Sequence, residues 1–366
     1  MGSIKRKFGN NITSGKFDAT DLTGTIPASN VANASLTSVT ALPGISGDFI
    51  QTVASDPPAP SFGDVWYNST EQKVKLLGLT PASWATGGSL SNARLAGFPS
   101  GAGTQTASFY AGGQALPVPL AATEEYDGST WTAGGNLPAA KENGAGMGTL
   151  TAGLTASGSP GFGPINSTSE EYDGSSWAAS NPVNTGRIAL RGCGVQTAAL
   201  AFGGYTYPPF ILRNETEEYD GTSWVNSNPM NTARQELSGT GTQTAGLAFG
   251  GTTPAVTGAT EEYDGTSWTT SPGSLNTARA SLAGAGTQTA ALAFGGATPT
   301  RTGATEEYDG NSWTTSPTSL NTVRSYLAGS GNTSAALAFG GSTPPYSAAT
   351  EEYTGAAPVV RSIQGS

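Results

Sequence analysis

Histidine is absent from this chain of 366 residues, and cysteine occurs once, at Cys193. The absence of histidine excludes Ser-His-Asp and Cys-His catalytic sites as well as histidine-ligated metal centres. A single cysteine excludes an internal disulfide and a cysteine-based zinc site. We therefore expect no metal and no cofactor, and a stability that depends on packing.

Charged residues are few, 11 % of the chain, and acidic residues outnumber basic ones by 26 to 16. The net charge of −10 argues against nucleic acid as a direct partner, because phosphate binding requires a basic surface. No run of about 20 apolar residues occurs, so no membrane insertion is expected. The basic residues near the start are not followed by an apolar segment, so we expect no secretory signal.

Glycine and proline are abundant, with 52 and 23 residues, a composition compatible with disorder unless the glycines recur with a period. They do recur, in repeats of 44–47 residues marked by Glu-Glu-Tyr, by a tryptophan, by Leu-Ala-Phe-Gly-Gly and by a basic residue. A period of about 40–50 residues with such punctuation is typical of a β-propeller. The repeated aromatic residues, to which we assign a structural role, are Tyr126, Tyr172, Tyr219, Tyr263, Tyr308 and Tyr353, with Trp84, Trp131, Trp177, Trp224, Trp268 and Trp313.

The fifth repeat illustrates why we expect four strands in each repeat. Residues 280–285 are small and suit a strand at a crowded central channel, and residues 290–294 form a continuous apolar run typical of a strand buried on both faces. The two glycines that follow indicate positive φ or a close backbone approach. Residues 305–308 and 312–315 flank an Asp-Gly turn and predict a hairpin, whose Tyr and Trp would pack between neighbouring sheets.

The two ends of the repeat array are complementary. Trp84 has no Glu-Glu-Tyr before it, and Tyr353 has no tryptophan after it. If the Trp84 strand pairs with the last three strands, it completes a sixth sheet and leaves no long open edge. The sequence thus predicts an all-β, six-bladed propeller over residues 81–358, closed by an N-terminal strand, with a C-terminal tail at 359–366.

The order of the motifs resembles the kelch repeat over about residues 84–355. The resemblance implies a kelch-like propeller, a fold found in enzymes, adaptors and structural proteins, so the function requires other evidence. A copper oxidase of the kelch type would need histidine ligands and is excluded.

The residues before the repeats have a different composition. Residues 1–60 are rich in Ser, Thr, Asn and Ala, with too few apolar residues for a core, and we interpret them as an extended arm that orders against a partner. Residues 61–80 predict a β-hairpin with its turn at residues 68–72. Asp-Leu-Thr-Gly-Thr-Ile-Pro-Ala-Ser at 21–29 is similar to sequences of phage fibres, and Gly-Asp-Val-Trp-Tyr-Asn at 63–68 is similar to a module of phage structural proteins.

These resemblances, together with Gly/Ala/Thr-rich kelch-like repeats similar to those of phage appendages, imply a non-enzymatic virion protein of a tailed bacteriophage, assembled in the host cytoplasm. As a tail fibre, spike or head appendage, it would present the propeller for host-surface recognition or particle decoration. The implied partners are other virion proteins, a host-surface glycan and further copies of the chain. A basic cluster would anchor the arm on an acidic surface, unless it is an ordinary solvated terminus. The anchoring candidates are Lys5, Arg6, Lys7 and Phe8.

No catalytic residue is assigned. The Glu-Glu pairs offer the two acids of a glycan hydrolase, but six equivalent copies indicate a scaffold. The repeated arginines are interpreted in the same way, as ion-pair or hydrogen-bond elements. An insert with Tyr205, Tyr207 and Phe210 is the least scaffold-like aromatic cluster and the candidate ligand-binding site, unless it packs on its neighbour or on another subunit. A propeller hydrolase acting on host polysaccharide is the main alternative, and a cytoplasmic kelch-type adaptor is a third.

Overall fold

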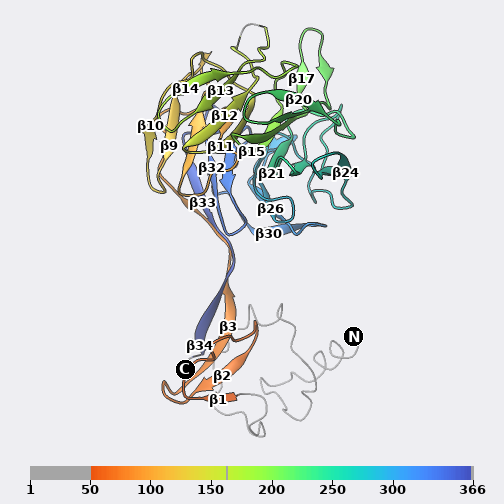
Figure 1. Ribbon diagram of the computed structural model, residues 1–366. Helices are drawn as coiled ribbons and strands as arrows, with labels where there is room; N and C mark the ends of the chain where they lie inside the picture. The colour runs from red at the N-terminus through yellow and green to blue at the C-terminus, as the bar shows by residue number, and fades with distance from the viewer. Residues whose placement is uncertain (1–50, 162–163, 364–366) are drawn as a thin grey trace. The chain divides into compact units, whose positions relative to one another are not determined.

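The computed structural model describes residues 51–161 and 164–363, and all regular elements in these ranges are β-strands (Figure 1). The chain divides into two compact units, one of residues 82–355 and one that joins residues 1–81 to residues 356–366. Each unit is described separately below. The candidate anchoring residues Lys5, Arg6, Lys7 and Phe8, and most of the predicted arm, lie outside the described residues.

The larger unit consists of six four-stranded antiparallel sheets, which confirms the predicted all-β repeat architecture. Each sheet is written here from its innermost strand outward and is numbered 1 to 6 in this order. Sheet 1 is β5 (Phe98–Pro99), β6 (Ser108–Ala111), β9 (Thr123–Tyr126) and β10 (Trp131–Ala133); sheet 2 is β11 (Ala145–Thr149), β12 (Ala152–Ala156), β13 (Ser169–Tyr172) and β14 (Trp177–Ser180); sheet 3 is β15 (Arg191–Val195), β16 (Ala198–Phe202), β19 (Thr216–Tyr219) and β20 (Trp224–Ser227); sheet 4 is β21 (Ser238–Thr242), β22 (Ala245–Phe249), β23 (Thr260–Tyr263) and β24 (Trp268–Thr270); sheet 5 is β25 (Ala283–Gly286), β26 (Ala291–Phe294), β29 (Ala304–Tyr308) and β30 (Trp313–Ser319); sheet 6 is β31 (Ala328–Gly331), β32 (Ala335–Phe339), β33 (Thr350–Thr354) and β4 (Ser83–Thr86).

The fifth repeat shows both the agreement with the sequence and a difference. Tyr308 lies opposite Trp313 in the predicted hairpin, and Gly295 and Gly296 at the end of β26 have φ of 65° and 99°. The innermost strand, however, begins at residue 283 and not at residue 280. Ser281 has φ of 54°, which is incompatible with a continuous strand, and its N–H bonds a residue of the preceding sheet.

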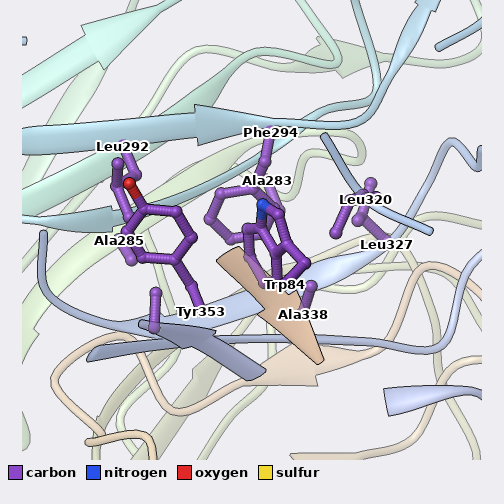
Figure 2. Packing of buried hydrophobic residues seen from close by; sticks show 10 residues of the cluster. Trp84, Ala283, Ala285, Leu292, Phe294, Leu320, Leu327, Ala338 and Tyr353 are labelled. Atoms are coloured by element: carbon purple, nitrogen blue, oxygen red, sulfur yellow. The ribbon is translucent and has the colours of Figure 1, made fainter. Parts of the chain in front are cut away.

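Sheet 6 combines distant parts of the chain, because β4 pairs antiparallel with β33 and brings Trp84 opposite Tyr353. Figure 2 shows the Trp84 ring beside Tyr353 and Phe294, with ring centroids 5.1 and 5.0 Å away. The indole N–H donates a hydrogen bond of 3.0 Å to the hydroxyl of Thr305 in sheet 5. Trp84 therefore belongs to the hydrophobic core between sheets 5 and 6.

The smaller unit contains one sheet with the order β1-β2-β3-β34. Strands β2 (Val65–Asn68) and β3 (Lys73–Thr80) form a hairpin, and β1 (Gln51–Val53) pairs with β2 in parallel. Residues 359–366 were expected to be a tail, and this expectation was wrong for residues 359–363. They belong to β34 (Ala357–Ile363), which pairs antiparallel with the whole of β3. The pairing satisfies backbone groups that a two-stranded hairpin leaves open.

Candidate ligand-binding site

The first glutamate of each Glu-Glu pair forms a buried ion pair with the basic residue of its own sheet. In sheet 3, an Arg187 Nη and a Glu217 Oε lie 2.9 Å apart, and both side chains are fully buried. Burial lowers the pKa of Arg187, and the charge of Glu217 opposes this effect. In sheet 2, Lys141 takes the place of the arginine. The six pairs are Arg94–Glu124, Lys141–Glu170, Arg187–Glu217, Arg234–Glu261, Arg279–Glu306 and Arg324–Glu351.

The second glutamate of each pair accepts a hydrogen bond from the tyrosine hydroxyl of the neighbouring sheet. Burial, and then the bond to Glu262, raise the pKa of Tyr308 to about 12, so this phenol remains a donor. Both carboxylates of every pair are thus used within the scaffold, in agreement with the structural interpretation. The six bonds are Tyr126 to Glu352, Tyr172 to Glu125, Tyr219 to Glu171, Tyr263 to Glu218, Tyr308 to Glu262 and Tyr353 to Glu307.

The repeated tryptophans also connect neighbouring sheets. All twelve repeated Tyr and Trp side chains are buried, as their predicted structural role requires. Each indole N–H donates to a hydroxyl at the start of the third strand of an adjacent sheet. These bonds are Trp84 to Thr305, Trp131 to Thr350, Trp177 to Thr123, Trp224 to Ser169, Trp268 to Thr216 and Trp313 to Thr260.

Two residues after each basic residue, the chain adopts positive φ at a residue other than glycine. The φ values lie between 53° and 59°, a strained conformation for such residues. Each N–H bonds the carbonyl of the equivalent residue in another sheet, for example Asn143 to Ala96 at 2.8 Å and Ala96 to Tyr326 at 3.1 Å. Backbone bonds between all six sheets hold these turns in place. We call the six residues the ring residues: Ala96, Asn143, Ala189, Glu236, Ser281 and Tyr326.

A pocket of about 290 Å³ lies against four of the six ring residues. Glu236 is fixed there, because its carboxylate accepts hydrogen bonds from Tyr326 at 2.8 Å and from Ser281 at 2.9 Å. Burial, and next Glu236, raise the pKa of Tyr326 to about 12, so the phenol stays protonated at neutral pH. The pocket is therefore polar and rich in hydrogen-bonding groups. Its lining residues are Leu95, Gln114, Asn143, Ala189, Tyr205, Glu236 and Tyr326.

The loops between the second and third strands of sheets 1 and 3 begin at this pocket. Gln114 and Tyr205, the first residues of two such loops after the glycine pair, form β-bridges with Leu95 and Ile188, beside the ring residues. The corresponding loops of three sheets contain a short two-stranded element: β7 (Gln114–Ala115) with β8 (Val118–Pro119), β17 (Tyr205–Thr206) with β18 (Ile211–Leu212), and β27 (Ala297–Thr298) with β28 (Thr300–Arg301). Exposed apolar side chains occur in the loops between the second and third strands of sheets 1, 3 and 4, namely Leu116, Val118, Tyr207, Phe210, Ile211 and Val256.

The structure divides the predicted ligand-binding residues between the pocket and the surface. Tyr205 lines the pocket, and its ring lies 4.9 Å from that of Phe210. Phe210 and Tyr207 are 54 % and 63 % exposed. The sequence analysis missed the ring residues. An alignment of the six repeats could have found them, because these six equivalent positions carry five different amino acids in repeats that are otherwise nearly identical.

Within residues 51–161 and 164–363, no group of three or more His, Cys, Asp or Glu side chains is arranged to hold a metal ion. The same described ranges contain no helix long and apolar enough to cross a membrane. No protein-family model matches the chain, and a comparison with curated proteins found no match.

Proposed function

We propose that residues 82–355 form a closed, kelch-like propeller of six four-stranded blades. Three kinds of contact between sheets 1 and 6 support closure: the bond from Ala96 to Tyr326, the bond from Tyr126 to Glu352 and the bond from Trp131 to Thr350. The same three contacts recur between the other neighbouring sheets. In this architecture β4 supplies the fourth strand of the sixth blade and removes an open edge.

We further propose that the protein is a non-enzymatic structural protein of a tailed-phage particle that recognises the host surface or decorates the particle. The observation that supports recognition is the gathering of varied residues and exposed loops around one pocket, on a scaffold whose repeated acids are all engaged. Differences between near-identical repeats are where a binding surface is expected, because the shared residues are committed to packing. The phage-like segments at 21–29 and 63–68 support the particle assignment.

Immunogold labelling of purified particles, with an antibody against residues 82–355, tests this function. Gold on the tail or its fibres is expected for host attachment, and gold over the head for decoration. Deletion of residues 1–60 should leave the propeller folded and abolish labelling. A double substitution, Tyr207→Ser with Phe210→Ser, is the control and should label normally. Unlabelled wild-type particles, or full labelling after the deletion, would contradict the proposal.

A glycan hydrolase is the second candidate, and Glu142 is the observation that favours it. Its side chain is 7 % exposed, Oε2 has no hydrogen-bond partner among the described residues, and the next residue, Asn143, lines the pocket. Burial raises the pKa of this carboxyl, as a general acid requires. Reducing ends released from host polysaccharide by the wild-type protein, and lost in Glu142→Gln, would support hydrolysis. If the wild-type protein releases none, this candidate is eliminated.

A further inference from the structure

Three residues that line the pocket are larger and more polar than the repeat requires. Gln114 and Tyr205 occupy the same position in two repeats, where each forms a β-bridge with the residue before a ring residue. Glu236 occupies a ring position at which Ala96 and Ala189 make the same backbone contacts. Because smaller side chains hold these positions in other repeats, the fold does not account for the three polar ones. The residues equivalent to Gln114 and Tyr205 are Ser159, Thr252, Ala297 and Ser342.

Glu236 gives the pocket a fixed hydrogen-bond acceptor. Its two carboxylate oxygens accept bonds from Tyr326 and Ser281, at 2.8 and 2.9 Å, and these bonds hold the group in one orientation. A carboxylate has about four acceptor sites, so acceptor capacity remains for a ligand. None of the described residues that line the pocket is basic. A ligand group that donates a hydrogen bond therefore suits this carboxylate, and an anion does not.

Gln114, Asn143 and Tyr205 give the pocket polar groups without protein partners. The side-chain oxygen of Gln114 accepts a hydrogen bond of 2.8 Å from Tyr346, and its amide nitrogen bonds nothing in the described part of the chain. The Asn143 amide and the Tyr205 hydroxyl likewise form no side-chain hydrogen bond within the described ranges. Amide and phenol groups donate hydrogen bonds, so the pocket also offers donors to a ligand that can accept.

Two apolar residues, Leu95 and Ala189, also line the pocket. Clefts that bind small ligands combine such apolar walls with a few converging polar groups. The ligand group that matches this lining has a donor, an acceptor and an apolar end, and an acetamido group has all three. An ammonium group has only donors and leaves Gln114 and Tyr205 unmatched. A hydroxyl group donates and accepts but has no apolar part to contact the two apolar residues.

The places of Gln114 and Glu236 in the fold suit the two polar ends of an amide. Gln114 belongs to the repeat of sheet 1, and Glu236 precedes β21 of sheet 4, so the two lie on opposite sides of the proposed six-bladed ring. The N–H and C=O of a trans amide point in opposite directions. One amide between these side chains therefore donates to the carboxylate and accepts from the glutamine.

We propose that the pocket binds a saccharide with an acetamido group, such as N-acetylglucosamine. The amide N–H donates to Glu236, and the carbonyl accepts from Gln114. The methyl group packs on Leu95 and Ala189, and the sugar ring lies against the aromatic face of Tyr205. This inference rests on the proposed recognition function and names the class of ligand bound at that site.

Calorimetric titration of the full chain with three tetrasaccharides of the same linkage tests the proposal. Chitotetraose carries an acetamido group at C2, cellotetraose a hydroxyl group, and fully deacetylated chitotetraose an ammonium group. We expect cellotetraose to bind about tenfold more weakly than chitotetraose, because the bond from Gln114 and the burial of the methyl group are lost. The deacetylated sugar should also bind more weakly than chitotetraose, since it cannot accept a hydrogen bond at C2.

Gln114→Ala tests the residue that accounts for this preference. We expect about threefold to tenfold weaker binding of chitotetraose, because one hydrogen bond is lost, and unchanged binding of cellotetraose. The variant is expected to fold, because Ala297 occupies the equivalent position in another repeat. Thr252→Ala is the matched control. It changes the equivalent position of a third repeat, which does not line the pocket, and should bind as the wild type does.

Equal affinity for chitotetraose and cellotetraose, tighter binding of the deacetylated sugar, or no binding of any of the three would overturn the proposal. Wild-type affinity of Gln114→Ala for chitotetraose would overturn the assigned contact and the proposal with it. Failure here is distinct from failure of the proposed function, because particle labelling is measured separately. Particles that label while the chain binds no acetamido sugar contradict only this inference, and binding without labelling contradicts only the virion assignment.

Discussion

At the scale of single residues, the two glutamates of each repeat show how strand geometry assigns different roles to adjacent identical side chains. Successive side chains on a strand point to opposite faces. In sheet 4, Glu261 therefore meets Arg234 within the sheet, and Glu262 meets Tyr308 of the neighbouring sheet. A slip of one residue would move each side chain to the opposite face and break at least one of these contacts, so they favour a single register.

Replacing one buried arginine by alanine should lower the stability of the protein strongly, whereas replacing it by lysine should lower the stability less. Arg234→Ala leaves Glu261 buried without its partner, at an expected cost of about 3–5 kcal/mol in the free energy of unfolding. Arg234→Lys should lose less, because Lys141 forms the equivalent pair with Glu170 in sheet 2. Guanidinium chloride unfolding measures both. Equal losses for the two variants would show that the charge of residue 234 contributes nothing.

Glu142 should make stability depend on pH in a predictable direction. Burial raises its pKa in the folded protein above the ordinary value of 4.5. The folded state thus holds this proton more tightly than the unfolded state, and the resulting stabilisation is present below the ordinary pKa and lost as pH rises through the raised one. Glu142→Gln should therefore melt higher than the wild type at about pH 7, and the difference should shrink by about pH 4. A difference in melting temperature that does not change with pH would contradict this assignment.

At the scale of the element, β4 shows how a strand of four residues can complete a sheet and cover its open edge. It covers the edge of β33, and Trp84 fills the space between Phe294 and Tyr353 (Figure 2). No local sequence property requires this pairing, since the two strands are separated by nearly the whole repeat array. It follows from the complementary ends of the array, where one tyrosine strand and one tryptophan strand lack partners.

Removal of β4 should destabilise the larger unit far more than removal of the residues before it. A chain of residues 82–355 keeps β4, and we expect it to unfold cooperatively as a monomer. A chain of residues 88–355 loses Trp84 and exposes β33, so we expect a loss of at least about 3–5 kcal/mol and self-association. Thermal unfolding and size-exclusion chromatography compare the two. Similar behaviour would mean that β4 is dispensable.

At the scale of the whole molecule, the contacts between sheets form a repeating series in which sheet 1 meets sheet 6 as it meets sheet 2. If six blades are needed to complete the series, a chain with one repeat fewer cannot make every contact without distortion. Deletion of residues 235–279 removes one period and rejoins equivalent positions. We expect this chain to associate, or to unfold at a lower temperature, in light scattering and circular dichroism. A monomer as stable as the wild type would contradict a requirement for six.

The sequence by itself determined the all-β repeat, because the same aromatic and glycine residues recur along the chain every 44–47 residues. It also indicated the structural role of the repeated Tyr, Trp, Glu and Arg residues, because a residue that recurs in every repeat is expected to serve packing and not a single functional site. It did not reveal the pairing of β34 with β3, which joins two segments of unrelated sequence. The role of the ring residues was likewise decided only by the tertiary structure. It depends on which residues of different repeats meet at one pocket, and that is a property of packing and not of local pattern.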